Sequence, residues 1–163
     1  MIYVALGANM PSPVGPPEVT LQRAMEAMPR HGITVTSVSP FYRTPAWPNP
    51  ADPDFVNAVV EVKTRLGPGE LLKALLAIEK AFGRVRKRAN EPRTLDLDLI
   101  DYGGLSSEVE QLSLPHPRLH ERAFVLRPLA DIAPGWRHPD TGQGVSELLG
   151  IVGEAGLERL PSS

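Results

Sequence analysis

The sequence predicts an α+β fold with a mostly antiparallel sheet. Short apolar or β-branched runs alternate with two stretches in which apolar residues recur at helical spacing. Segments rich in proline and glycine separate these stretches and mark the turns between them. The resulting order is strand, helix, strand, strand, helix, strand. That order is typical of a ferredoxin-like β-α-β-β-α-β core with its helices on one face of the sheet.

The first half of the chain supplies three strands and one helix of this core. Alternating or continuous apolar residues mark the strands, and apolar residues three or four apart mark the helix. The expected elements are a strand over Ile2–Leu6, a helix over Glu18–Met28, a strand over Ile33–Arg43, a proline-rich loop over Thr44–Pro53 and a strand over Phe55–Leu66.

The second half completes the core and adds a helical extension at its C-terminal end. Pro68 stands at a favoured first helical position, and Gly83 is placed to end that helix. The expected elements are a helix over Pro68–Phe82, a basic loop over Arg84–Arg93, a strand over Thr94–Tyr102, a loop over Leu114–Leu119, helices over Ala123–Ile132 and Val145–Val152, and a frayed end over Glu158–Ser163.

Composition narrows the class of protein. The chain of 163 residues, 42% of them hydrophobic, predicts one domain over residues 1–163. A net charge of −2 argues against a general nucleic-acid binder. No apolar run approaches the roughly 20 residues that span a bilayer, and no cysteine is present. We therefore expect a cytoplasmic protein that binds neither nucleic acid nor membrane. We also expect a monomer rather than an oligomer.

Two aspartates in the last strand of the core predict a metal site. Asp96 and Asp98 are two residues apart, so on a strand they project from the same face, while Leu95, Leu97 and Leu99 face the opposite side. Neighbouring carboxylates repel each other unless a cation lies between them. Oxygen ligands favour Mg²⁺, which binds one or two carboxylates together with substrate phosphates. The alternative for such a pair is an exposed polar face of an amphipathic strand.

A basic loop directly precedes these aspartates. The loop contains a single acid, Glu91, and several cationic residues: Arg84, Arg86, Lys87, Arg88 and Arg93. Guanidinium groups match phosphate oxygens bidentately and offset the charge that develops during phosphoryl transfer. This loop beside the aspartate pair indicates a metal–phosphate site, with a solvated loop or an RNA contact as alternatives.

Other segments carry side chains suited to an anion or to a heterocycle. Two histidines and two arginines lie close together in Pro115–Arg122 and form a candidate anion site. The amide of Asn57 can read the edge of a heterocycle. Aromatic rings that can stack on such a heterocycle, or else pack in the core, are Trp47, Phe55 and Phe124. The sequence contains neither of the glycine-rich phosphate-binding fingerprints of nucleotide-binding proteins.

Motifs along nearly the whole chain resemble those of the 6-hydroxymethyl-7,8-dihydropterin pyrophosphokinase family. The most specific is the Pro92–Asp98 string, Pro-Arg-Thr-Leu-Asp-Leu-Asp. The other matching elements, in order, are Ala5–Asn9, Phe41–Pro45, Asp54–Ala58, Ile78–Glu79, Gly83–Arg86, Leu114–Pro117 and Arg122–Phe124. The resemblance implies a ferredoxin-like enzyme of folate synthesis that uses ATP as co-substrate.

The resemblance also implies roles for individual residues. Asp96 and Asp98 would hold two Mg²⁺ ions, and Arg84 and Arg93 would act with them in catalysis. The residues implied to bind ATP are Glu79, Arg84, Arg86, Arg93, His116 and Arg122. Those implied to bind the pterin are Thr44, Pro45, Phe55, Asn57 and Phe124, with the two phenyl rings sandwiching the heterocycle.

The chain departs from the family pattern in the basic loop, and two other functions compete with the implied one. Asn90-Glu91 stands where relatives often carry an aromatic residue. One competing function is a two-metal phosphoesterase or nuclease built on the same aspartates, which gives no reason for a pocket between Thr44 and Asn57. The other is a non-catalytic module that binds RNA through the basic loop, against which the net charge of −2 counts.

Overall fold

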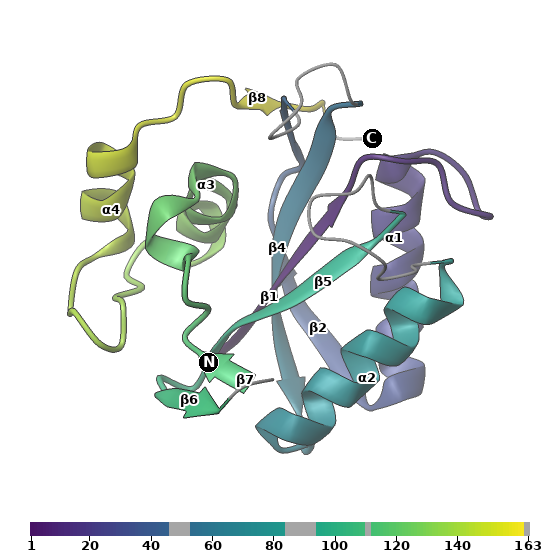
Figure 1. Ribbon diagram of the computed structural model, residues 1–163, viewed down its shortest axis with the longest axis horizontal. Coiled ribbons are helices and arrows are strands. Elements are labelled where there is room, and N and C mark those ends of the chain that lie inside the picture. The colour runs from purple at the N-terminus through teal and green to yellow at the C-terminus, as the bar shows by residue number, and fades with distance from the viewer. Residues whose placement is uncertain (46–52, 84–93, 110–111, 162–163) are drawn as a thin grey trace.

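A computed structural model describes residues 1–45, 53–83, 94–109 and 112–161. Its main sheet is antiparallel at every described pairing, with the order β5-β1-β4-β3-β8 and with β2 also paired to β4 (Figure 1). The strands are β1 Ile2–Ala8, β2 Ile33–Val38, β3 Tyr42–Thr44, β4 Phe55–Thr64, β5 Asp96–Tyr102 and β8 Glu158–Arg159. The fold is therefore a mixed α/β structure around an antiparallel sheet.

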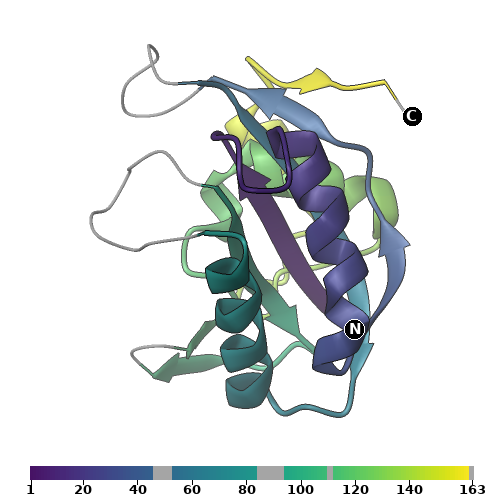
Figure 2. The ribbon, with the colours of Figure 1, turned by 90° about the vertical axis from the view of Figure 1, so that its right-hand side faces the viewer.

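Two helices cover one face of this sheet, and they agree closely with the sequence prediction. α1 spans Pro17–Ala27, and the short 3-10 helix η1, Met28–His31, follows it directly. α2 spans Pro68–Ala81, where Pro68 occupies the first turn and the Glu70 carboxylate accepts the Gly67 N–H at 3.3 Å. Gly83 ends this helix at φ +84°, in the left-handed region that glycine adopts readily. Figure 2 shows the two helices side by side in front of the strands.

Alternation along the strands divides the core into two layers, one on each face of the sheet. In β1, Val4 and Leu6 face α1 and α2, whereas Tyr3 and Ala5 belong to a second apolar cluster. That second cluster is closed by α3, Ala123–Ile132, and α4, Val145–Val152. The helices expected as an extension thus cover the face opposite α1 and α2 (Figure 1).

The strand expected over Ile33–Arg43 is in fact divided into β2 and β3. Ser39 lies at the break, where its backbone N–H donates to the Val59 carbonyl at 3.0 Å and its Oγ accepts the Val59 N–H at 2.9 Å. Pro40 follows and has no N–H to continue a ladder. The serine hydroxyl therefore replaces a backbone partner at the point where the strand is interrupted.

Three smaller differences concern the later part of the chain. β5 begins at Asp96 rather than at Thr94. A separate pair of short strands, β6 Ser107–Val109 and β7 Leu112–Leu114, was not predicted, and the 3-10 helix η2, Leu119–Glu121, follows it. The expected fraying from Glu158 is wrong for Glu158–Arg159, because this segment pairs with β3 as strand β8. Among the described residues, no helix combines the length and the apolar character that a bilayer crossing requires.

Candidate active site

A row of residues across three strands forms the floor of the candidate site. Gly7 of β1 lies directly opposite Asp96 of β5 on one side and Asn57 of β4 on the other. Directly opposed residues share a sheet face, so the side chains of Asp96 and Asn57 flank the glycine on the face that carries α3. Asp98 lies two residues further along β5, opposite Ala5. The two aspartates thus share one face, and Leu95, Leu97 and Leu99 pack in the core beneath α1 and α2.

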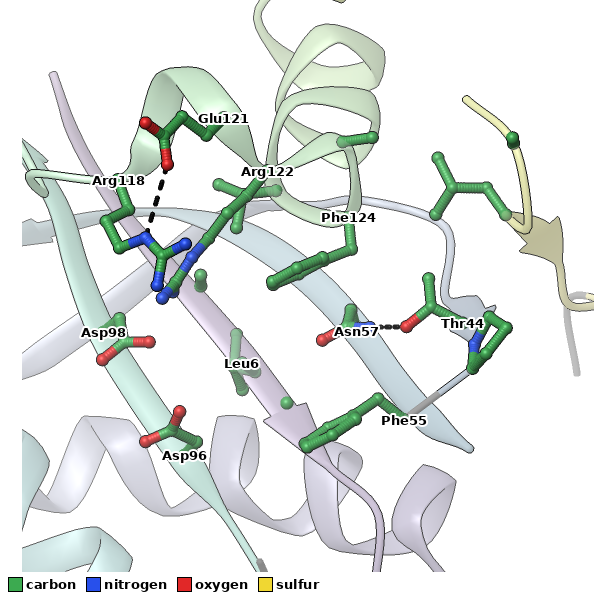
Figure 3. A pocket seen from close by; sticks show the side chains of 17 residues that line it. Leu6, Thr44, Phe55, Asn57, Asp96, Asp98, Arg118, Glu121, Arg122 and Phe124 are labelled. Atoms are coloured by element: carbon green, nitrogen blue, oxygen red, sulfur yellow. Dashed lines mark hydrogen bonds and ion pairs between the residues drawn. The ribbon is translucent and has the colours of Figure 1, made fainter. Parts of the chain in front are cut away.

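The floor opens into a cavity of about 420 Å³ beside the first turn of α3 (Figure 3). A volume of this order is typical of a small-molecule site. Residues from distant parts of the chain line it: Ala5, Leu6, Gly7, Thr44, Pro45, Phe55, Asn57, Asp96, Asp98, Arg118, Glu121, Arg122, Ala123, Phe124, Val125, Ala155 and Leu157.

One end of the cavity is charged. The carboxylates of Asp96 and Asp98 lie across from the guanidinium groups of Arg118 and Arg122, which come from the segment around η2 (Figure 3). The Arg118 Nε donates to a Glu121 carboxylate oxygen at 3.4 Å. The Arg122 guanidinium carbon lies 5.6 Å from the centre of the Phe124 ring, within the range of a cation–π contact. Acidic and basic groups therefore face each other across a space that can hold a metal–phosphate unit.

His116 lies behind this charged end and does not line the cavity. Its backbone N–H donates to the Ile100 carbonyl at 3.0 Å, and its Nδ1 accepts the Arg118 N–H at 3.2 Å. Burial, reinforced by the positive charge of Arg122, lowers the pKa of His116 to about 4. The ring is thus neutral at pH 7. Because Nδ1 is an acceptor, the ring proton is assigned to Nε2, which leaves that nitrogen as an uncharged donor.

Glu79 also lies behind the cavity, on α2, and is only 1% exposed. Its Oε2 accepts the Leu97 N–H at 2.7 Å. β5 is the edge strand of the sheet, and Leu97 is the residue between the two aspartates. A buried carboxylate on a helix therefore fixes the outer edge of the strand at the point where both aspartates leave it.

The other end of the cavity carries an amide and two aromatic rings. Asn57 is 6% exposed, and its Nδ2 donates to the Thr44 Oγ at 3.2 Å. Phe55 stands at the start of β4 and Phe124 in the first turn of α3, and both rings lie beside Asn57 in Figure 3. Pro45 follows β3 and completes this side. An amide and a hydroxyl between flat rings are suited to a planar heterocycle with polar edges.

Gly7 keeps the floor between the two ends bare. A Cβ atom at this position would lie 2.9 Å from the Asn57 Oδ1, closer than real Cβ contacts come. Any larger residue would therefore displace the amide that faces the cavity. The glycine at the end of the first apolar run was visible in the sequence, but its place between Asp96 and Asn57 follows only from strand pairing.

The structure thus brings eight of the predicted site residues to one cavity: Thr44, Pro45, Phe55, Asn57, Asp96, Asp98, Arg122 and Phe124. Glu79 and His116 lie behind its walls. Arg84, Arg86 and Arg93, together with Trp47, fall outside the described residues. Sequence reasoning missed Ala155 and Leu157, since small apolar residues near the end of a chain carry no recognisable signal.

The donor set of the charged end suits a magnesium ion that shares its ligands with a substrate. Among the described residues, no group of three or more histidine or acidic side chains is placed to hold a metal by itself. Asp96 and Asp98 provide carboxylate oxygens only, and nitrogen or sulfur ligands typical of zinc do not accompany them in the cavity lining. Mg²⁺ characteristically binds to one or two carboxylates and takes its remaining ligands from water and phosphate. The residues present therefore fit this ion.

Fold and cavity together define a small-molecule-binding α/β protein. Its cavity has a charged end, at Asp96 and Asp98, and a second end at Asn57, Phe55 and Phe124, which we call the ring-binding end. A family model described as 7,8-dihydro-6-hydroxymethylpterin-pyrophosphokinase (HPPK) matches residues 3–134. The chain belongs to this HPPK family.

Individual relatives agree with this assignment. The chain is 44% identical to a 2-amino-4-hydroxy-6-hydroxymethyldihydropteridine pyrophosphokinase of Pseudomonas aeruginosa, over 99% of this chain and 98% of the relative. It is also 44% identical to a protein of the same name from Synechocystis, over 90% and 73% respectively. A solved HPPK-DHPS triple mutant of Plasmodium falciparum superposes with a TM-score of 0.73 at 13% identity over 97% of this chain, which shows a shared fold. The chain spans 46% of that longer protein.

Proposed function

We propose that this protein transfers a pyrophosphate group from Mg·ATP to the hydroxymethyl group of 6-hydroxymethyl-7,8-dihydropterin. One observation carries the proposal: Asp96 and Asp98 share a single cavity with the Asn57–Thr44 pair and two aromatic rings. A site for phosphate chemistry and a site for a polar heterocycle therefore lie side by side. Membership of the HPPK family and the names of close relatives support the same reaction.

The ring-binding end orients the pterin in this proposal. Phe55 and Phe124 stack on the two faces of the ring, while Asn57 and Thr44 hydrogen-bond with its polar edge. The Asn57–Thr44 hydrogen bond of 3.2 Å already holds the amide in one orientation before substrate arrives. Pro45 adds an apolar contact beside Thr44. The hydroxymethyl arm then points along the bare floor at Gly7 toward the aspartates.

The charged end holds the triphosphate. Asp96 and Asp98 would bind Mg²⁺, which when bound neutralises phosphate charge and aligns the phosphate oxygens. Arg122 donates to phosphate oxygens from the opposite wall, and the neutral His116 offers its Nε2–H. Arg84, Arg86 and Arg93 are assigned the same task from the basic loop, with Arg84 and Arg93 acting in the transition state. Glu79 supports this end from behind through the Leu97 N–H.

The proposed reaction is one displacement at the β-phosphorus. The hydroxyl oxygen of the pterin forms a bond to that atom while the bond to the oxygen bridging the α- and β-phosphorus atoms breaks. AMP leaves with the electron pair of the broken bond, and the hydroxyl proton passes to solvent. Two substrates held in line by opposite ends of one cavity gain most of their acceleration from alignment and charge stabilisation.

Several finer features belong to the same proposal. The strand order β5-β1-β4, with β2 also on β4, supports a ferredoxin-like core extended by α3 and α4. We propose two Mg²⁺ ions, because two carboxylates, those of Asp96 and Asp98, lie where the triphosphate is proposed to bind. We also propose that residues 1–163 work as one domain and as a monomer in the cytoplasm.

The decisive test is product analysis with Mg·ATP, with and without 6-hydroxymethyl-7,8-dihydropterin. Phosphorus NMR and nucleotide chromatography should show AMP and a pterin diphosphate in equal amounts, and only when the pterin is present. ADP or free phosphate in place of AMP, or turnover without pterin, would refute the proposal. Hydrolysis of a phosphodiester by the same protein would instead favour the metal-dependent phosphoesterase.

A further inference from the structure

The chain's C-terminal segment, Glu154–Leu160, forms a wall of the cavity that the proposed function does not use. Ala155 and Leu157 both line the cavity. Figure 3 shows this segment passing beside Thr44, at the end of the cavity opposite Asp96 and Asp98. Its apolar side chains therefore limit the cavity where the ring-binding end finishes.

Several contacts hold this wall in place against β3. β8 pairs with Tyr42 and Arg43, and the Leu160 N–H donates to the Phe41 carbonyl at 2.8 Å. These backbone bonds fix the far end of the segment to the same strand that carries Thr44.

The near end of the segment is fixed by side chains of α3. Arg127 lies 3.5 Å from a Glu154 carboxylate oxygen and donates to Asp131 at 3.0 Å. The Tyr42 hydroxyl also donates to Asp131, and burial together with this contact raises the pKa of Tyr42 to about 12. Glu154 of the wall is thus connected through Arg127 and Asp131 of α3 to Tyr42 of β3, a buried tyrosine that stays protonated.

Gly156 allows the wall to approach the ring-binding end closely. Its φ of +83° lies in the left-handed region, and a Cβ there would meet the Pro45 Cδ at 3.4 Å. A side chain at this position would therefore strain the backbone and come into van der Waals contact with the residue next to Thr44. Gly142 also has a positive φ, +73°, but a Cβ there meets nothing within 4 Å. The two glycines share a positive φ and differ in the contact with the cavity.

The direction of the substrate decides which part of it meets the wall. The reacting hydroxymethyl arm must reach the phosphate beside Asp96 and Asp98. The opposite end of the bicyclic ring, which carries the 2-amino group, then points toward Thr44 and the C-terminal segment. This step rests on the proposed function, because it takes the pterin as the occupant of the cavity.

We propose that Leu157 and Ala155 determine substrate specificity by closing the cavity against the 2-amino end of the pterin. They admit an unsubstituted amino group and exclude one that carries an alkyl group. Gly156 is a positioning residue in this arrangement, because it acts through the placement of its two neighbours.

The first test compares two ligands on two proteins. Binding of 6-hydroxymethyl-7,8-dihydropterin and of its N2-methyl derivative is measured by ligand fluorescence, with Mg²⁺ and an ATP analogue whose α- and β-phosphorus atoms are bridged by methylene. The wild-type protein should prefer the parent compound strongly. Leu157→Ala should reduce that preference about 10-fold, because a hydrophobic wall discriminates one methyl group by about this factor. An unchanged preference would overturn the proposal.

The second test separates the wall from general strain. Gly156→Ala should weaken pterin binding about 5-fold and leave binding of the ATP analogue unchanged, because a side chain at this positive φ, in contact with Pro45, shifts the wall beside the ring-binding end. Gly142→Ala also places a side chain at a positive φ, but outside the wall and without that contact, and should leave both affinities as in the wild type. Equal effects of the two substitutions on pterin binding would contradict the positioning role.

These measurements also separate failure of the wall from failure of the proposed function. A wild-type protein that binds the ATP analogue but no pterin would refute the function itself. A wild-type protein that binds the parent pterin, but accepts the N2-methyl derivative equally well, would refute only the specificity of the wall.

Discussion

The two ends of the cavity are built in opposite ways. The charged end takes its acids from residues two apart on one strand, Asp96 and Asp98, whose shared face follows from strand periodicity. The ring-binding end collects Thr44, Asn57 and Phe124 from separate elements that only the fold brings together. The charged end therefore depends on one short stretch of a strand whose edge is held in place. The ring-binding end depends on the docking of several elements, so remote changes should affect it more readily.

The largest expected effect is at the charged end. Asp98→Asn removes a carboxylate charge while keeping the size of the side chain. We expect kcat to fall about 1,000-fold, because metal-held phosphate charge contributes several kcal/mol to the transition state. AMP formation measures this loss, and an unchanged thermal unfolding midpoint shows that the fold survives. Activity close to that of the wild type would refute the proposal that Asp98 binds the metal. It would also refute the difference drawn between the two ends of the cavity.

The support behind the charged end gives the next largest effect. Glu79→Ala leaves the Leu97 N–H buried without its acceptor, so the free energy of unfolding should fall by about 3 kcal/mol. Glu79→Gln keeps an oxygen acceptor and should lose about half as much. Urea denaturation of both variants measures the difference. Equal losses would show that charge, and not the hydrogen bond to Leu97, is what the strand edge requires.

Acidification should weaken the fold through His116. Its folded pKa of about 4 lies below the ordinary value of 6.5, so between these two pH values the unfolded chain binds a proton that the folded chain excludes. The free energy of unfolding therefore falls as the pH is lowered, by about 2 kcal/mol from pH 7 to pH 5 for this group. The lowered pKa of His138 adds a contribution of the same sign.

Urea denaturation at pH 7 and pH 5 checks this dependence. His116→Gln should reduce the slope, and His138 should account for part of what remains. A slope as steep in His116→Gln as in the wild type would place the main titrating group elsewhere than at the charged end.

The smallest expected effect sharpens the comparison at the junction between the two ends. Gly7→Ala places a methyl group against the Asn57 Oδ1, so the KM for pterin should rise about 10-fold while the KM for ATP stays unchanged. Gly135→Ala, where a Cβ meets nothing within 4 Å, is the matched control. A rise in both KM values would mean that the two ends do not respond separately.

Much of the fold was predictable, because its helices carry clear local signals. Pro68 and Gly83 mark the limits of α2, and α3 and α4 were predicted at their observed bounds. The break between β2 and β3 was missed, although Pro40 marks it in the sequence, because the β-branched run continues toward it; the Ser39 side chain, bonded to a distant strand, also interrupts the ladder.

The residues of the candidate site were likewise predictable only where the signal is local. Spacing of two residues sufficed for Asp96 and Asp98. The HPPK resemblance supplied Thr44 and the pterin-binding roles of Asn57 and the two phenylalanines. Physical reasoning had offered only an amide that can read a heterocycle edge, and rings that either stack on it or pack in the core. Ala155 and Leu157 escaped both approaches, because their place in the cavity depends on the pairing of β8 with β3.

The hydrogen bond from Leu97 to Glu79 gives this protein a built-in spectroscopic probe. An amide proton held at 2.7 Å donor–acceptor distance by a buried carboxylate resonates well downfield in a proton NMR spectrum and exchanges slowly with solvent. This amide belongs to the residue between the two aspartates, yet it lies on the outer edge of the strand, away from the cavity. Its resonance can therefore be followed during a titration with magnesium or nucleotide, and it reports on the backbone behind both carboxylates without any label in the site.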